Sequence, residues 1–335
     1  MSGRRWLPLL LASVGCTQTP DVVASDDAVS AGGVSAGGAP AAEIPELIAL
    51  SGATDMRDPS ALFDGARLWF FGSGGDLPIR ATSDLSVVTD EGAAFVQPPE
   101  WVATLVPNAK GFWSPEIAFF GGAFHLYYAV STLGSSRSCI GHATRDQLGA
   151  GSAWLDQGAV ICSSLTDDWN AIDPNLLETE DGALWLAFGS YLSGIKLVRL
   201  DAEGMKPASD MVALATRTEG GGALQAAALA QHQGYFYLFV SFGVDTSHRL
   251  LVGRASAIEG PYVDRQGERL LDGAGTSVLE ADARFAGPGS NDIVVNGERT
   301  YNVYHAYDAE NAGRPVLRVA TLVWDDEGWP MSGGP

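Results

Sequence analysis

The sequence predicts an all-β protein with the architecture of a five-bladed β-propeller. Three observations predict it: a strand–turn–strand unit recurs along the chain, its five copies are evenly spaced, and helical periodicity is almost absent. In each copy a short apolar strand leads through a glycine-containing turn into an aromatic or β-branched strand, which is the pattern of a β-hairpin. The copies begin roughly 50 to 65 residues apart, the interval at which propeller blades repeat.

The clearest copy is the stretch NAIDPNLLETEDGALWLAFGS at residues 170–190, in which Asp173-Pro174 precedes a glycine turn and an aromatic strand. The five copies begin, in chain order, at Asp58, Ser114, Asp173, Gln225 and Ser290. Their second strands are expected in RLWFFGS, AFHLYYAVS, ALWLAFGS, YFYLFVSFG and RTYNVYHAYD. We expect the copies to form one domain over residues 45–335.

Composition indicates an ordered body and restricts its partners. The chain has 335 residues, is 46% hydrophobic and contains 41 glycines, which is enough to bury a substantial core between many turns. The net charge of −20 argues against a nucleic-acid partner or an anionic membrane surface, because the electrostatic interaction would be repulsive. A neutral polymer or small neutral ligand remains compatible with this charge. We expect a monomer.

The N-terminus has the pattern of an export signal. In residues 1–16, Arg4 and Arg5 precede a short apolar segment that ends at Gly15-Cys16. A small residue directly before cysteine resembles a bacterial lipoprotein signal, which would place a lipid on Cys16 and the protein on the outer membrane or cell surface. Ordinary secretion, or a cytoplasmic protein with an apolar start, are the alternatives. Residues 17–44 have the Ala/Gly/Ser-rich composition of a flexible linker.

Two further cysteines lie in neighbouring strand-like segments. Cys139 and Cys162 flank a turn-rich stretch, so they can lie on adjacent antiparallel strands and pair in an oxidising compartment. Alternatively, both are small buried hydrophobic residues. A zinc site is not expected, because His142 is the one nearby histidine and there is no CxxC spacing.

Candidate catalytic residues lie at the starts of the copies. The innermost strands of a propeller line a central channel, which brings Asp58, Ser114 or Glu116, Asp173 and Gln225 around one pocket. Carboxylates from different blades can activate water and protonate a leaving oxygen, which is the requirement for glycoside hydrolysis. A single Asp-Pro pair more commonly opens a turn, so the prediction depends on the recurrence.

Aromatic and polar side chains near these starts are candidates for sugar contacts. Trp113 and Trp169 can stack on a sugar ring, and Ser114, Asn170 and Ser190 can form hydrogen bonds with it. Packing in the core is the ordinary alternative for each tryptophan.

Several long motifs resemble glycoside hydrolase family 43, most closely its arabinan endo-1,5-α-L-arabinosidases. They are RDPSALFDGARLWFFGSG, FWSPEIAFFGGAFHLYYAVST, CIGHATRD, WNAIDPNLLETEDGALWLAFGSYLSGIKLVRLD and LLVGRASAIEGPYVD, and the similarity covers about residues 50–330. The resemblance implies an inverting hydrolase of α-1,5-linked arabinan or a related arabinose- or xylose-containing glycan. It makes Asp58 the general base and Asp173 the carboxylate that orients the general acid and raises its pKa.

The general acid position departs from the family. The family carries a glutamate in an Ile-Glu-Ala-Pro sequence ahead of the blade-four aromatic strand, whereas this chain has ALQAAALAQHQGYFYLF, with Gln225 in its place. A glutamine has no titratable proton to give. The alternative function is therefore a catalytically impaired glycan-binding propeller, and a third is a protein-interaction scaffold. Glu219 is a possible substitute acid, whereas Glu259 matches a later turn of the family.

A second departure concerns the calcium ion that the resemblance implies in the channel. Where the family has histidine in Gly-Pro-Gly-His-Asn, this chain has GPGSND, with Ser290 at the histidine position. His305 does not match that position and is expected to be a strand residue. No cofactor is therefore expected, and no metal.

Overall fold

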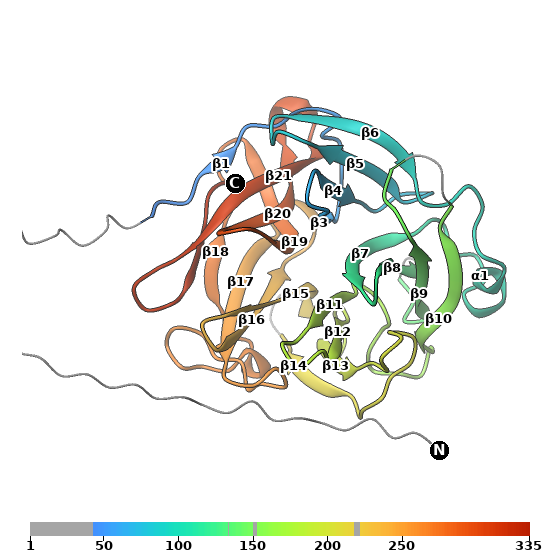
Figure 1. Ribbon diagram of the computed structural model, residues 1–335. Helices are drawn as coiled ribbons and strands as arrows, with labels where there is room; N and C mark the ends of the chain where they lie inside the picture. Colours follow the sequence, from blue (N-terminus) through green and yellow to red (C-terminus); the bar gives the residue numbers. More distant parts are fainter. Residues whose placement is uncertain (1–42, 133, 150–152, 218–221) are drawn as a thin grey trace, which may run out of the picture. The chain divides into compact units, whose positions relative to one another are not determined.

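A computed structural model describes residues 43–132, 134–149, 153–217 and 222–335. The predicted export signal and nearly all of the predicted linker lie outside the described residues. The described strands form five sheets arranged around a common centre (Figure 1). This confirms the five-bladed β-propeller.

Each blade contains the predicted hairpin and two or three further strands. Blade I has β3 (Ser60–Phe63), β4 (Leu68–Phe71), β5 (Pro78–Thr82), β6 (Val87–Ala93) and the short β2 (Ser51–Gly52). Blade II has β7 (Trp113–Phe120), β8 (Ala123–Ser131), β9 (Ser138–Arg145) and β10 (Leu155–Ser163). Blade III has β11 (Asn175–Glu178), β12 (Leu184–Phe188), β13 (Ile195–Arg199) and β14 (Val212–Ala215). Blade IV has β15 (Leu224–His232), β16 (Tyr235–Phe242), β17 (Arg249–Ala255) and β18 (Thr276–Leu279).

Blade V is completed by the N-terminal end of the described chain. It contains β19 (Phe285–Asn296), β20 (Arg299–Asp308), β21 (Arg314–Trp324), β22 (Pro330–Ser332) and β1 (Leu47–Ile48). Strand β1 pairs with β21, with Leu47 opposite Ala320, so the last blade is held by both ends of the domain. The pairing closes the ring of blades.

Short helices occur only in connections among the described residues. They are α1 (Glu100–Leu105), η2 (Asp245–Ser247), η3 (Leu270–Asp272) and η4 (Ala309–Asn311). In the described part of the chain, no helix is both long and apolar enough to cross a bilayer.

The hydrophobic core is divided among the five interfaces between neighbouring blades. Because successive side chains of a strand point to opposite faces, each strand packs against both neighbours. In β8, Tyr128 packs among residues of blade I, whereas Tyr127 packs among residues of blade III. In β4, Phe71 faces blade II and Phe70 faces blade V. Each blade is therefore stabilised from both sides, and the inner strands are held at fixed positions around the axis.

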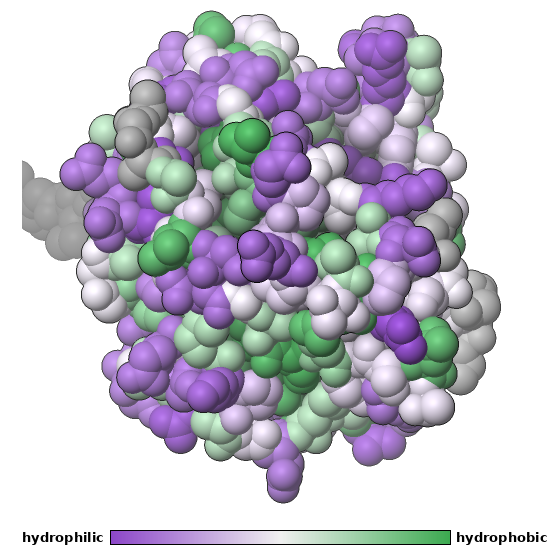
Figure 2. All heavy atoms as spheres, turned by 90° about the vertical axis from the view of Figure 1, so that its right-hand side faces the viewer, coloured by the Kyte–Doolittle hydropathy of each residue, from purple (hydrophilic) through white to green (hydrophobic). Residues whose placement is uncertain are grey.

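The face seen in Figure 2 has no single dominant character. On the side seen in Figure 2, hydrophilic residues spread over the coloured surface with smaller hydrophobic groups between them. Scattered apolar side chains of this kind are normal for a protein in water.

The two cysteines of blade II form a disulfide. Cys162 in β10 lies opposite Cys139 in β9, and their Cα atoms are 4.1 Å apart. The structure thus decides between the two sequence-based alternatives in favour of pairing. The bond joins the two outer strands of one blade.

Removing this disulfide should lower the free energy of unfolding by about 3 kcal/mol, because the cross-link shortens the unfolded chain across 23 residues. Urea unfolding of the Cys139→Ala, Cys162→Ala double variant tests this. Dithiothreitol should lower the midpoint of the natural protein and leave that of the double variant unchanged. Equal midpoints for natural protein and variant under oxidising conditions would contradict the expectation.

Candidate active site

One residue in or just before the innermost strand has the same unusual backbone conformation in every blade. A left-handed φ is found at Asp58 (48°), Ser114 (40°), Asp173 (54°), Ala226 (52°) and Ser290 (48°). This conformation is unfavourable for residues other than glycine, and it turns the side chain out of the regular strand direction. The repeat corrects the predicted alignment in blade IV: the equivalent of Asp58 is Ala226, and Gln225 lies one residue earlier.

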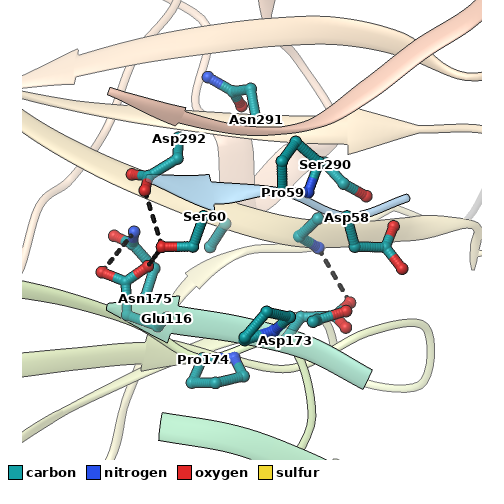
Figure 3. A pocket seen from close by; sticks show the side chains of 14 residues that line it. Asp58, Pro59, Ser60, Glu116, Asp173, Pro174, Asn175, Ser290, Asn291 and Asp292 are labelled. Atoms are coloured by element: carbon teal, nitrogen blue, oxygen red, sulfur yellow. Dashed lines mark hydrogen bonds between the residues drawn. The ribbon is translucent and has the colours of Figure 1, made fainter. Parts of the chain in front are cut away.

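Four of these turned residues, Asp58, Ser114, Asp173 and Ser290, line a cleft of about 1080 Å³. The predicted site residues that line it are Asp58, Trp113, Ser114, Asn170, Asp173, Ser190, Gln225 and Ser290. In Figure 3 the carboxylates of Asp58 and Asp173 point toward the same side of the site. Of the two candidates at the start of blade II, Ser114 lines this cleft, whereas the Glu116 side chain lines a narrower axial channel with Ser60 and Asp292.

Asp58 is held as an anion by its surroundings. Its carboxylate accepts a hydrogen bond from the Ser73 hydroxyl at 2.6 Å, and the Arg57 guanidinium lies 3.4 Å away. Burial raises the pKa of Asp58, but neighbouring groups, Arg57 and Ser73 among them, outweigh burial, so the pKa lies below its ordinary value. An ionised carboxylate in a cleft can accept a proton from water, which suits a general base.

His305 is a site residue that the sequence reasoning placed only in a strand. Its Nδ1 accepts a hydrogen bond from the backbone N–H of Asp58 at 3.1 Å and lies 3.6 Å from the carboxylate. Burial lowers the pKa of His305 to about 4, so its ring is neutral at neutral pH. The ring therefore supports the left-handed backbone of Asp58, and Arg57 and Ser73 hold its charge.

Asp173 lies in a different environment. Its Oδ2 accepts a hydrogen bond from the Ala226 backbone N–H at 3.1 Å, and the Ser114 hydroxyl is a second partner. Burial raises the pKa of Asp173 to about 6, with a further increase from the charge of Asp58, although Ser114 and the Ala226 N–H act in the opposite direction. Part of the Asp173 population therefore carries a proton in weakly acidic solution.

Gln225 lies in the cleft wall, and its side-chain amide forms a hydrogen bond with a buried histidine. Its Nε2 is 2.6 Å from Nε2 of His248, a residue that is only 2% exposed. Burial lowers the pKa of His248, so the pair is neutral at neutral pH. The amide can form a hydrogen bond with a ligand, but it cannot release a proton to a leaving group.

The predicted sugar contacts separate into two groups. Trp113 lines the cleft and is half-buried, which leaves it available for contact with a ligand. Trp169 instead packs edge-on against Phe188 in the core between blades II and III. Asn170 and Ser190 line the cleft but bond each other, since Asn170 Oδ1 accepts from the Ser190 N–H at 2.8 Å.

The rim of the cleft carries an ion pair that the sequence reasoning did not find. Arg57 donates to Asp245 at 2.8 Å, and the Tyr307 hydroxyl donates to the same carboxylate oxygen at 3.2 Å. Arg57 was visible directly before Asp58, but Asp245 comes 188 residues later, in a segment without a recognisable motif. This pair joins blades I and IV beside the cleft.

The axial channel beneath the cleft contains a hydrogen-bond network that requires an extra proton. The Ser60 hydroxyl lies 3.0 Å from Glu116 Oε2 and 2.8 Å from Asp292 Oδ2, and it accepts from the Ile117 N–H (Figure 3). One hydroxyl hydrogen cannot serve two carboxylates, so a proton on Glu116 completes the set by donating to Ser60. Burial, together with the charge of Asp292, raises the pKa of Glu116 well above its ordinary value, and burial raises that of Asp292 to about 6.

Glu116→Gln should stabilise the protein increasingly as the pH rises. Folding raises the pKa of Glu116, so its stabilising contribution is complete below the unfolded pKa and is lost as the pH rises through the folded pKa. A glutamine amide can donate to Ser60 and accept from Asn175 and the Leu176 N–H at any pH. The difference in unfolding free energy should grow between pH 5 and 8 by up to about 1.4 kcal/mol per pH unit.

Denaturant unfolding at several pH values measures this difference. Glu116→Ala is the matched control, because it removes the same titratable group together with its hydrogen bonds and should destabilise the protein throughout. A Glu116→Gln difference that does not change with pH would contradict a buried proton at this position.

The acidic side chains of the channel are bonded to other groups of the protein. All four carboxylate oxygens of Glu116 and Asp292 are already bonded, within the channel wall, to Ser60, Asn175 or backbone N–H groups. Ser290 stands at the histidine position, and its N–H donates to Ser241 Oγ at 2.8 Å. In the described ranges, no group of three or more His, Cys, Asp or Glu residues is arranged to hold a metal ion.

The possible substitute acids have different outcomes. Glu219 lies outside the described residues. Glu259 is exposed, and it lies in the connection that follows β17, as expected for a turn residue.

A five-bladed propeller that places acidic side chains from different blades in one large cleft has the paired carboxyl groups that glycoside hydrolases use. The sequence profile described as "Glycosyl hydrolases family 43" matches residues 52–330. The chain belongs to this family. The match covers all five blades, so it includes the whole candidate site.

Individual relatives agree with this assignment. The extracellular endo-α-(1→5)-L-arabinanase 1 of Bacillus subtilis is 39% identical over 285 residues, covering 82% of this chain and 87% of the relative. A structure of native Bacillus subtilis arabinanase superposes with a TM-score of 0.79 at 38% identity, covering 84% of this chain and 98% of that one. The α-L-arabinanase of Cellvibrio cellulosa, solved with arabinohexaose, has a TM-score of 0.79 and 31% identity, with coverage of 83% and 95%.

Proposed function

We propose that the protein binds α-1,5-linked arabinan, or a related arabinose- or xylose-containing glycan, in this cleft and hydrolyses it slowly with inversion. The observation that carries the proposal is the presence of Gln225 in the same cleft as the two retained carboxylates, Asp58 and Asp173. Asp58 is available as the general base, whereas Gln225, at the usual position of the general acid, cannot donate a proton.

The substrate class follows from the relatives and from the cleft. Two similar proteins are arabinanases, and one of them was solved with a six-residue arabinan fragment. A cleft of about 1080 Å³ can hold several sugar units, and a neutral polysaccharide is not repelled by a protein of net charge −20. The half-buried Trp113 offers an apolar face for a sugar ring.

In the proposed reaction, Asp58 accepts a proton from a water molecule as that water attacks the anomeric carbon from the side opposite the leaving oxygen. The bond between the anomeric carbon and this oxygen breaks, and the configuration is inverted. A sugar leaving oxygen needs a proton as the bond breaks. Loss of a positioned acid lowers the rate by about 10² to 10⁴.

A glycan-binding propeller without turnover is the second candidate. It is favoured by the contact between Gln225 and His248, which keeps the amide in place and uses its hydrogen-bonding capacity inside the wall. In this case the cleft would serve to hold the polysaccharide.

Two measurements on the natural protein separate these candidates. Release of reducing ends from linear arabinan, with the first-formed anomer identified by NMR, reports hydrolysis and its stereochemistry, while calorimetry with arabino-oligosaccharides reports binding. Slow release of the inverted anomer supports the hydrolase. Binding without release supports the second candidate. The absence of both binding and release would overturn both candidates. Release should be insensitive to EDTA, because we propose no channel metal.

We further propose that the protein is an exported monomer. The leader at residues 1–16 and its Cys16 favour a lipid-anchored form, and the similar arabinanase of Bacillus subtilis is an extracellular protein. Mass spectrometry of the N-terminal peptide from the native host distinguishes a lipidated Cys16 from a secreted, unlipidated chain.

A further inference from the structure

We propose that Asp173 itself donates the proton to the leaving sugar oxygen in this protein, in place of the side chain at position 225. This inference rests on the proposed hydrolase function and names the acid that this function lacks. It changes the role of Asp173 from orienting another acid to contacting the leaving oxygen.

The first argument is position. Asp173 lines the cleft with Asp58, and its carboxylate reaches across from blade III to blade IV, where Oδ2 lies 3.1 Å from the Ala226 N. Ala226 directly follows Gln225, so the Asp173 carboxyl is next to the usual acid position. Asp58 and Asp173 both line the cleft, and their carboxyl groups point toward the same side in Figure 3.

The second argument is the set of charged partners. Within the described part of the cleft lining, the acidic side chains are those of Asp58, Asp173 and Asp245. Asp58 and Asp245 both lie beside the Arg57 guanidinium, at 3.4 and 2.8 Å, and a cation at that distance favours the ionised form. Asp173 forms no ion pair with a described residue, so it is the cleft carboxyl best able to keep a proton.

The surroundings of Asp173 and Asp58 therefore shift the pKa values of the two carboxyl groups in opposite directions. Burial raises the pKa of Asp173 to about 6, whereas the pKa of Asp58 lies below its ordinary value. Two carboxyl groups whose pKa values are pushed apart are suited to act as acid and base. The titratable and charged groups that surround Asp173 are Asp58 and Arg57 from blade I and Tyr191 after β12, with Ser114 as the polar neighbour from blade II.

The step balances with one water molecule. The water oxygen bonds to the anomeric carbon while one of its protons passes to Asp58. The bond between the anomeric carbon and the leaving oxygen breaks, and the proton of Asp173 passes to that oxygen. Afterwards Asp58 is protonated and Asp173 is ionised, and proton exchange with solvent restores both groups.

Leaving-group dependence tests the inference directly. Aryl arabino-oligosaccharides with a phenyl leaving group need an acid, whereas those with a dinitrophenyl group leave without one. Asp173→Asn should lower the rate with the phenyl substrate by about 10² to 10⁴ and change the rate with the dinitrophenyl substrate only a few fold. Equal losses on both substrates would overturn the inference.

A second variant, Ser114→Ala, tests the same inference through the pH dependence of kcat/KM and does not depend on whether an Asp173 variant folds. The Ser114 hydroxyl lowers the pKa of Asp173, so Ser114→Ala should raise it and keep the acid protonated to higher pH. The kcat/KM of the natural protein should fall above a pH of about 6, and this limb should move to higher pH in Ser114→Ala. An unmoved limb would overturn the inference.

Two controls address other donors. Asp245→Asn and Glu219→Gln should each affect the phenyl and dinitrophenyl substrates alike, and a selective loss in either variant would assign the proton to that residue instead. If the natural protein cleaves neither substrate, the proposed hydrolysis itself fails. If it cleaves both and Asp173→Asn is not selective, only the present inference fails.

Discussion

Gln225→Glu should raise kcat on linear arabinan by about 10² or more, within the range of 10² to 10⁴ expected for a positioned general acid. The Gln225 side chain lines the cleft, and the next residue, Ala226, donates its backbone N–H to Asp173. A carboxyl group at position 225 would therefore lie next to Asp173, at the position that the family resemblance assigns to the general acid. His248, 2.6 Å away, can donate to the new carboxylate, which favours its ionised form and shifts the activity optimum to lower pH. Reducing-end release across pH 4 to 8 measures both effects.

Gln225→Met is the matched control, because methionine has a similar size and no proton to give. It should show no gain in kcat, and binding of arabino-oligosaccharides to both variants should be compared by calorimetry. Unchanged turnover in Gln225→Glu with intact binding would contradict Gln225 as the limiting substitution.

Asp58→Asn should abolish measurable hydrolysis, with a loss of about 10² to 10⁴ in kcat, while arabino-oligosaccharide binding persists. The amide keeps the shape of the carboxylate and can still accept from Ser73, but it cannot take a proton from water. Arg57 retains Asp245 as its partner at 2.8 Å, so the loss of the Asp58 charge does not leave this cation unpaired.

Asp272→Asn provides the control for loss of an acidic charge. Asp272 forms an exposed ion pair with Arg269 on the surface, and such pairs contribute little, so hydrolysis should be unchanged. Hydrolysis that survives in Asp58→Asn would show that another group activates water.

The repeat of the blades is the part of this fold that could be predicted from the sequence. Each blade is a local unit of hairpins with glycine turns and aromatic strands, so its pattern appears within about twenty residues and recurs. The strand β1, by contrast, has only two residues, and its partner β21 comes from the other end of the domain. No local pattern could identify it.

For the site, sequence alone determined the family, the positions of Asp58 and Asp173 at blade starts, and the glutamine at position 225. These are properties of residue type within long motifs. Whether Cys139 and Cys162 pair depended on the register of β9 and β10, which a sequence leaves open. The position of Glu116 outside the cleft depended on the direction of its side chain after a left-handed residue.

Only the tertiary structure decided the environment of each site residue. Asp58 meets His305 across 247 positions of the chain, and Ser60 meets Asp292 across 232. His248, which lies directly before β17, contacts Gln225 across 23 positions of the chain. Burial and charge at such contacts set which carboxyl holds a proton and which accepts one, because pKa values depend on neighbours in space. Sequence determined which chemical groups are present at the axis, and the closure of the ring determined their protonation.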